Sequence, residues 1–377
     1  MTHACNWFDA LPLSRQRKLL ASTRDGLAVI IDGRQLLNFA SNDYLALSTH
    51  PKVCAAAKNI LDKRGLGSGA SRLVSGDSPL LHKLECELAA WKGFESCLVV
   101  GSGMLANLGL IQALANRHTH IFADKLNHAS LVDGARLSGA RVHRYSHLDL
   151  ARLEFLLQKF PADKRMIVSD GVFSMDGDKA DVVCLLKLAQ EYDALLIIDD
   201  AHGTGTVGKL GKGLIAEAGV SGHACLLEVG TLGKALGSYG AYILGSSPMI
   251  EGLRQRMRTF IFSTALPECV IAGALAALAE IQTTHVVNQL QDNITYFLEQ
   301  AKALPLMPSV TAIQPLLLGS DEEALYAASY LHEQGYFVPA IRPPTVPEGT
   351  ARLRITLSAG HHQQDVDSFI KALSNLV

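Results

Sequence analysis

Short apolar runs alternate with amphipathic segments through the middle of this chain. Between residues 96 and 245, seven runs have the aliphatic character and the length of buried strands. They cover residues 97–101, 120–124, 141–146, 166–170, 195–199, 225–230 and 240–245. Segments with the apolar spacing of helices separate most of them, for example 104–116 and 182–192. The pattern predicts an α/β fold: a mainly parallel seven-stranded sheet covered by helices on both faces.

The two flanks of this region follow another pattern. The first 45 residues resemble an arm, with a hairpin predicted around Asp32-Gly33-Arg34. Near the end, helices at 267–281 and 284–303 precede strand candidates near 313–318, 336–341 and 352–357, and a helix at 364–376. A chain of 377 residues exceeds one simple core. We predict an N-terminal arm (1–45), a large α/β domain (46–260) and a smaller α+β domain (261–377).

Composition and charge narrow the class of protein. Apolar residues make up 48% and charged residues 19%, as is typical of a globular enzyme. The formal net charge of -2 gives no bias toward nucleic acid or anionic membrane. Residues 1–18 lack an apolar signal core, and the longest apolar stretch, 269–281, is too short to span a bilayer. Seven scattered cysteines without a CxxC pattern indicate a reducing compartment, the cytoplasm.

The strongest chemical signal lies between residues 194 and 237. An apolar run ends in Asp199-Asp200-Ala201-His202, and Lys234 follows among small and apolar residues. A buried parallel strand delivers such acids to the sheet edge where ligands bind. A sheltered lysine loses its proton more readily, because burial disfavours the ammonium. Pyridoxal phosphate chemistry needs this pair, a Schiff-base lysine and an acid on the pyridine nitrogen; solvated acids and a surface lysine are the alternative.

Other segments carry weaker signals with plain structural alternatives. The helix start at Gly103 suits a phosphate but also fits an ordinary βα turn. His128 could lie flat on a cofactor ring or only begin a helix, and Ser174 could bind a ligand in a loop whose acids merely shape a turn. Strand alternation puts Arg352 and Arg354 on one face, where arginine clamps a carboxylate bidentately. A solvated edge strand would show the same alternation.

Two glycine motifs after His202 do not predict nucleotide binding. Residues 203–208 spell GxGxxG, and residues 203–209 spell GxxxxGK with Leu210 where serine or threonine is needed. Both motifs require strand, glycine turn and helix in succession. Here four residues separate strand from glycine, and Gly211 and Gly213 oppose a helix. No HExxH motif or cysteine–histidine cluster predicts a metal site.

Six segments in the same order resemble the α-oxoamine synthase family of fold type I pyridoxal phosphate enzymes, from about residue 15 onward. They are Asn42-Asp43-Tyr44-Leu45, Gly67-Ser68-Gly69, Asn127-His128-Ala129-Ser130, Phe173-Ser174-Met175-Asp176-Gly177, Asp199-Asp200-Ala201-His202-Gly203 and Gly230-Thr231-Leu232-Gly233-Lys234. The resemblance implies a cytoplasmic homodimer with a shared active site. Three positions depart from the family pattern: Met104, Tyr239 and Glu268.

The resemblance assigns a role to each site residue. Lys234 would hold pyridoxal phosphate and act as base, and Asp199 would bond the pyridine nitrogen while Asp200 is structural. His128 would stack on the ring, with His202 and Ser174 on its oxygen side. The phosphate would be bound by Gly103, Met104, Thr231 and, from the partner subunit, Thr264. Asn42 and Arg354 would hold the amino-acid carboxylate, and Thr345 and Arg17 the acyl substrate.

Two further segments resemble one branch of that family. Ala312-Ile313-Gln314-Pro315 and the proline-rich stretch 342–347, which we predict to be a stiff extended loop, match the branch that joins L-alanine to a pimeloyl thioester in biotin biosynthesis. The acyl carrier would be CoA or acyl carrier protein. Two alternatives stay open: a sister enzyme using glycine or serine with another acyl-CoA, and a Rossmann-type oxidoreductase that binds a nicotinamide cofactor at 203–208.

Overall fold

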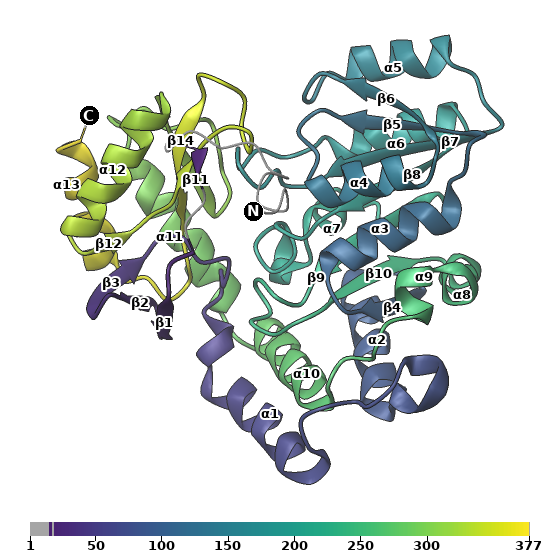
Figure 1. Cartoon of the computed structure of the whole chain (residues 1–377), viewed down its shortest axis with the longest axis horizontal. Coiled ribbons are helices and arrows are strands. Elements are labelled where there is room, and N and C mark those ends of the chain that lie inside the picture. Colours follow the sequence, from purple (N-terminus) through teal and green to yellow (C-terminus); the bar gives the residue numbers. More distant parts are fainter. Residues whose placement is uncertain (1–14, 17–18, 377) are drawn as a thin grey trace, which may run out of the picture.

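A seven-stranded sheet forms the centre of the computed structural model, which describes residues 15–16 and 19–376 (Figure 1). Its order is β4-β10-β9-β8-β7-β5-β6. The strands are β4 (Ser96–Val100), β5 (Thr119–Asp124), β6 (Arg141–Tyr145), β7 (Lys164–Asp170), β8 (Ala194–Asp199), β9 (Leu226–Thr231) and β10 (Ala241–Gly245). Only β10 runs antiparallel to its neighbours, β4 and β9. The predicted α/β fold with a mainly parallel sheet is confirmed.

Helices cover both faces of this sheet, because its strands are apolar on both sides. Leu196 and Ile198 of β8 belong to one hydrophobic cluster, whereas Ile197 between them belongs to the other. Burial of each such side chain contributes about 1.5–3 kcal/mol. The covering helices are α2 (Pro79–Lys92), α3 (Gly103–Leu114), α4 (Ala129–Leu137), α5 (Leu150–Lys159), α6 (Val182–Glu191), α8 (Ser247–Arg256) and α9 (Arg258–Ile261).

The two flanks of the chain meet in a second region (Figure 1). One sheet has the order β1-β2-β3-β12, and another the order β11-β14-β13. The strands are β1 (Ser22–Asp25), β2 (Ala28–Ile31), β3 (Arg34–Asn38), β11 (Ile313–Gly319), β12 (Tyr336–Phe337), β13 (Ala340–Ile341) and β14 (Ala351–Thr356). The helices here are α11 (Val286–Gln300), α12 (Asp321–Glu333) and α13 (Gln363–Ser374). Strand β3 pairs in parallel with β12, so the N-terminal segment belongs to a sheet closed by a late strand.

Two local predictions in this region have different outcomes. The predicted hairpin is confirmed, since Asp32 and Gly33 both have positive φ and join β2 to β3 in a two-residue turn. The single strand predicted over 336–341 is wrong. Pro339 has no N–H for a ladder, and the chain passes there from one sheet to the other. The domain borders near residues 45 and 260 stay predictions.

Two long helices connect the regions. Helix α1 (Pro51–Arg64) lies beside α10 (Glu268–Thr283), and the short α7 (Leu214–Glu217) precedes β9 (Figure 1). Within residues 15–16 and 19–376, no single helix has the length and apolar composition to cross a membrane; α10 and α11, bent by 68° where they meet, pass that test only as a pair.

Candidate active site

The carboxyl ends of β7, β8 and β9 open into one cavity of about 600 Å³. Parallel strands bring the loops that follow them to the same edge of the sheet, which is where ligands bind in such folds. The cavity is lined by Gly103, Met104, His128, Ser130, Asp170, Val172, Ser174, Asp199, Ala201, His202, Thr231 and Lys234. The structure thus gathers eight of the predicted cofactor-site residues around one space.

Asp199, the last residue of β8, is held in a fixed orientation. Its Oδ2 accepts a hydrogen bond from Asn107 Nδ2 (2.6 Å), and its Oδ1 accepts one from the Ala201 N–H (3.0 Å). Asn107 is fully buried on α3 and also donates to Ser130 Oγ (2.8 Å). Sequence reasoning missed Asn107, because an asparagine inside a helix carries no motif. The carboxylate is therefore preorganised for a partner inside the cavity.

A second carboxyl group, that of Asp170, lines the same cavity as Asp199. Asp170, at the end of β7, is buried and accepts a hydrogen bond from the His128 N–H at 3.0 Å. Burial and the nearby Asp199 carboxylate raise the pKa of Asp170 well above its usual range. His128 Nδ1 lies 2.7 Å from Ser130 Oγ, and burial lowers the pKa of its imidazole. The site therefore presents one negative charge, that of Asp199, beside a neutral ring.

Lys234 lies in the loop between β9 and β10. The loop is tight at Gly237, which has φ of 60° and where an added Cβ would stand 2.3 Å from the Ser48 nitrogen. Burial lowers the pKa of Lys234 to about 8, and the charge of Asp199 only partly offsets that effect. Its Nζ lies 2.7 Å from His202 Nε2. An amine with this pKa can act as a base near neutral pH.

A chain of hydrogen bonds runs from Lys234 toward β14. His202 Nδ1 lies 2.6 Å from the Tyr44 hydroxyl, which is 3.2 Å from Asn42 Oδ1. Arg354 Nη2 donates to the same Asn42 oxygen at 3.2 Å. Burial, followed by the charges of Lys234 and Arg354, lowers the pKa of His202 well below its usual value. The predicted carboxylate-binding pair, Asn42 and Arg354, is therefore in direct contact and connected to the lysine.

The two arginines of β14 are not on a solvated edge, so that alternative is wrong. Strand β14 is the central strand of its sheet, and both side chains are buried. Arg352 forms an ion pair with Asp176 (2.7 Å), whereas Arg354 donates to the Ser174 carbonyl oxygen (2.5 Å). Both thus bind the loop that follows β7, but only Arg354 contacts Asn42.

The glycine motif after His202 packs around a buried charge cluster. Lys92 Nζ of α2 lies 3.4 Å from Asp200 Oδ2 and 2.5 Å from Glu228 Oε1, and all three side chains are buried. An added Cβ would stand 2.1 Å from Asp200 at Gly203 and 1.9 Å from it at Gly213. Residues 201–208 form turns and begin no α-helix. The glycines therefore serve close packing, and the expectation that Asp200 is structural agrees with these contacts.

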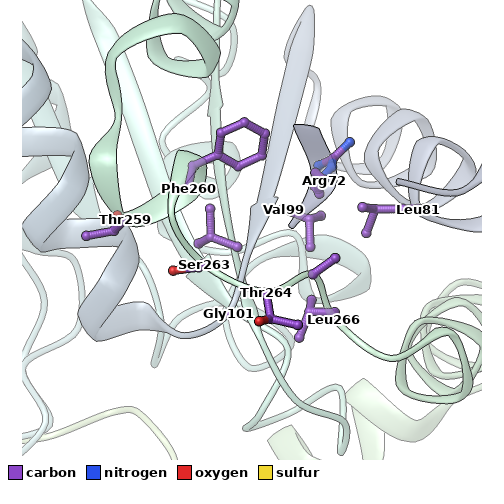
Figure 2. Close-up of a pocket in the computed structure, with 11 residues that line it drawn as sticks. Arg72, Leu81, Val99, Gly101, Thr259, Phe260, Ser263, Thr264 and Leu266 are labelled. Carbon is purple, nitrogen blue, oxygen red and sulfur yellow. The ribbon is translucent and has the colours of Figure 1, made fainter. Parts of the chain in front are cut away.

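Thr264 lies outside the lysine cavity of its own chain. It lines a separate pocket of about 290 Å³, where it stands near Gly101 and Leu266 (Figure 2). Thr264 also forms a β-bridge with Ser71, and nearby in sequence Leu73, Val74 and Phe262 expose 62%, 79% and 70% of their surface. By contrast, Gly103, Met104 and Thr231 line the lysine cavity itself.

Of the two predicted acyl-binding residues, only Thr345 lies in the part of the chain that the structure describes. Residues 343–346 form turns and bends, not the predicted extended loop, because the Thr345 N–H bonds the Arg342 carbonyl oxygen (3.0 Å) and proline fixes only its own φ. Thr345 is exposed there. Arg17 lies outside the described residues. The neighbouring Arg15 pairs with Glu348 at 2.8 Å.

The residues present fit pyridoxal phosphate. The cavity offers a lysine with a lowered pKa, an oriented buried carboxylate and the start of α3, whose first backbone N–H groups lack acceptors within the helix. In the part of the chain that the structure covers, no group of three or more histidine, cysteine or acidic residues could hold a metal ion.

Comparisons with known proteins agree with a pyridoxal phosphate site. The family model for aminotransferase class I and II matches residues 34–373. The chain is 45% identical over 368 residues to the 8-amino-7-oxononanoate synthase of Saccharophagus degradans, covering 96% of this chain and 92% of that one. It is 46% identical to that of Herminiimonas arsenicoxydans, covering 96% and 95%. A serine palmitoyltransferase structure from S. paucimobilis with bound PLP-myriocin aldimine superposes with a TM-score of 0.90 at 27% identity, covering 95% and 91%.

Proposed function

Since this chain belongs to the aminotransferase class I and II family, and within it to the 8-amino-7-oxononanoate synthases, we propose that it joins L-alanine to a pimeloyl thioester. Pyridoxal phosphate is its cofactor, and the products would be 8-amino-7-oxononanoate, CO2 and free thiol, a step of biotin biosynthesis. The observation that carries the proposal is the chain of contacts from Lys234 through His202 and Tyr44 to the Asn42–Arg354 pair.

Each residue of the cavity has a defined task in this reaction. Pyridoxal phosphate, when bound, supplies a ring that accepts the electron pair left on the α-carbon of the amino acid. Asp199 would keep a proton on the ring nitrogen, because an adjacent carboxylate favours the charged form. Lys234 would carry the cofactor and, as a free amine, take the α-proton. The backbone of Gly103 and Met104 would bind the phosphate together with Thr231.

Other residues would hold the ring and the substrates. His128 would contact the ring, and His202 and Ser174 its oxygen side. Arg354 and Asn42 would bind the alanine carboxylate, since the guanidinium fork matches a carboxylate. The α-carbon would then bond to the thioester carbonyl carbon while the thiol leaves with a proton. The alanine carboxyl group would then be lost as CO2, and the α-carbon, which keeps the electron pair of the broken bond, would take up a proton. Thr345 and Arg17 are our candidates for the acyl chain.

The test is a product analysis with matched variants. Purified enzyme with pyridoxal phosphate should release CO2 and form 8-amino-7-oxononanoate from alanine and pimeloyl-CoA or pimeloyl carrier protein, measured by mass spectrometry. Lys234→Ala should lower kcat by more than about 100-fold, the share of a general base. Asp199→Asn should retain cofactor but lose exchange of the alanine α-proton in deuterated water. Wild-type exchange in that variant would show that Asp199 is not the ring partner.

One observation favours a second candidate. The superposed S. paucimobilis structure is a serine palmitoyltransferase, so the same fold serves another amino acid and a longer acyl group. The identity of 27% to it, against 45% and 46% to the synthases, supports the alanine reaction over the serine one. Faster turnover of serine or glycine with palmitoyl-, succinyl- or acetyl-CoA would replace our proposal.

We also propose a homodimer that completes the site. Thr264 lines a pocket other than the lysine cavity of its own chain, and it forms a β-bridge with Ser71, close in sequence to the exposed Leu73 and Val74, while Phe262 is two residues before it. Apolar side chains grouped in this way are typical of an interface. Thr264 would there reach the phosphate held by the partner subunit.

A further inference from the structure

The hydroxyl of Tyr44 occupies the centre of the hydrogen-bond chain but has no role in the reaction as described above. We propose that Tyr44 is a positioning residue that holds His202 as its Nε2–H tautomer, by donating its hydroxyl proton to His202 Nδ1. The inference rests on the proposed function for its meaning in catalysis, but not for its geometry. His202 lines the cavity, so this tautomer presents a donor to whatever Lys234 holds there.

The Tyr44 side chain is fixed by its loop. The ring is fully buried, and the Tyr44 carbonyl oxygen accepts a hydrogen bond from the Ala359 N–H at 2.7 Å. The preceding Asp43 bonds Arg24 (2.9 Å) through its carboxylate and Ser358 Oγ (3.1 Å) through its carbonyl oxygen. A hydroxyl held on both sides in this way can select one ring nitrogen, because it has little freedom to follow a rotating imidazole.

The available protons decide which group donates. Burial raises the pKa of Tyr44, so its hydroxyl is protonated at neutral pH, and His202 is neutral because its pKa is lowered. A phenol has one proton, and a neutral imidazole has one donor and one acceptor nitrogen. The Tyr44 hydroxyl can donate to His202 Nδ1 at 2.6 Å or to Asn42 Oδ1 at 3.2 Å, where Arg354 already donates. The shorter contact, to an acceptor with no other donor, receives the proton.

The contact of His202 Nε2 agrees with the same tautomer. With Nδ1 as acceptor, the ring proton lies on Nε2, which faces Lys234 Nζ at 2.7 Å. A neutral amine accepts such a bond, and Lys234 is neutral above its pKa of about 8. The substrate-carboxylate end and the base are thus coupled through one tyrosine hydroxyl, and neither Asn42 nor Arg354 contacts His202 directly.

The first experiment measures the tautomer directly. Enzyme carrying ¹⁵N-labelled histidine is studied without cofactor at about pH 9, one unit above the pKa of Lys234. A His202→Asn spectrum identifies the His202 signals. We expect a protonated Nε2 and an unprotonated Nδ1 in the wild type, and a mixture of tautomers in Tyr44→Phe. Tyr242→Phe is the matched control, because it removes a buried hydroxyl that bonds Thr204 (3.0 Å) and not His202.

The second experiment is a double-mutant cycle on the loaded enzyme. Tyr44→Phe should lower kcat about three- to tenfold, the range of one hydrogen bond, and change the KM for alanine less than about twofold. In a His202→Asn background the same change should have no further effect. A protonated Nδ1 in the wild type, an unchanged spectrum in Tyr44→Phe, or additive losses in the cycle would each overturn the inference.

The two experiments separate two failures. If alanine and the pimeloyl thioester are not turned over, the proposed function fails, and the labelled-histidine spectrum still decides the role of Tyr44. If Tyr44→Phe does not fold, the wild-type spectrum alone decides it, since a proton on Nδ1 contradicts the assignment.

Discussion

At the residue scale, two neighbouring carboxyl groups differ in how well their surroundings stabilise a negative charge. Asp170 and Asp199 end adjacent strands, and both are buried. Asn107 and the Ala201 N–H stabilise charge on Asp199, whereas burial and Asp199 itself raise the pKa of Asp170. Close carboxylates cannot both ionise at low cost. The contacts at this pair therefore favour a negative charge on Asp199 over one on Asp170.

The two arginines of β14 allow a matched prediction. We expect Arg354→Lys to raise the KM for alanine about tenfold, because lysine cannot reproduce the guanidinium fork and a bond to a charged group contributes about 1.5–3 kcal/mol. Arg352→Lys should leave that KM nearly unchanged and lower the unfolding temperature instead, since Arg352 binds Asp176. Alanine titrations and thermal melts of both variants check this. Exchanged phenotypes would place the carboxylate at Arg352.

The sequence predicted the site residues that belong to short recognisable motifs. It did not predict the residues elsewhere that hydrogen-bond or pair with them. Lys234, Asp199, His128 and His202 stand in short recognisable segments, and the structure places them around one cavity. Asn107 and Lys92 sit inside helices without a motif, and their partners are distant in sequence. Tyr44 stood in a motif, but its contact with His202, 158 residues away, depends on the tertiary fold. Such contacts leave no local pattern.

At the element scale, His147 links the loop between β7 and α6 to the end of β5. His147 Nε2 lies 2.8 Å from Asp178 in that loop, and its Nδ1 lies 3.1 Å from Asp124 at the end of β5. Burial opposes a charge there, but the hydrogen bonds to Asp124 and Asp178 more than offset it and raise the pKa of His147 to about 10. The same loop carries Ser174 into the cavity.

This arrangement predicts a pH-dependent stability. The pKa of His147 rises from about 6.5 in the unfolded chain to about 10 in the folded one. Its stabilisation is thus complete below pH 6.5 and is lost as pH rises through 10. His147→Gln should lower the free energy of unfolding by about 2 kcal/mol near pH 6, and by much less near pH 10.5. Urea titrations at several pH values measure the difference.

A second histidine, His143 in the outermost strand β6, serves as the control. Burial lowers the pKa of His143 below the ordinary value of about 6.5, in contrast to that of His147. The stability difference between His143→Gln and the wild type should therefore stay constant between about pH 7 and 10.5. A constant difference for His147→Gln as well would show that His147 is not charged in the folded protein.

Periodicity found elements whose apolar pattern was clear. All seven strands of the large sheet and the helices α10, α11 and α13 were predicted within a few residues. Helix α1 was missed because Val53 is its only buried residue, so its sequence has little apolar periodicity. Helix α12 was missed for a similar reason, since alanines form much of its buried face. The short strands β12 and β13 merged in the prediction because Pro339 was not taken as a break.

At the scale of the whole molecule, the proposed shared site can be tested by mixing variants. In a heterodimer of Lys234→Ala with Thr264→Ala, one site receives its lysine from the second chain and its threonine from the first, so that site is native. We expect mixed dimers to regain native cofactor affinity at half of their sites, whereas Thr264→Ala homodimers bind the cofactor more weakly. Fluorescence titration of the separated species measures both.

The outcome depends on where Thr264 acts. If Thr264 contributed to the cavity of its own chain, each intact lysine would lie beside an altered residue 264, and mixing would restore nothing. A cofactor affinity equal to that of the wild type in the Thr264→Ala homodimer would show that Thr264 does not contribute to the cofactor site of either subunit.

The pairing of β3 with β12 has a consequence for the order in which the enzyme is made. Leu37 and its partner Tyr336 are about 300 residues apart, which at roughly 5–20 residues per second means that β3 leaves the ribosome about 15–60 s before β12. Until then the sheet of β1, β2 and β3 lacks a partner strand on the β3 side. The loop with Asn42 and Tyr44 also lacks Ala359, to which it is bonded. The strands around Lys234 can thus form during translation, but the Asn42–Arg354 pair, which we propose for the alanine carboxylate, can form only when β14 is released.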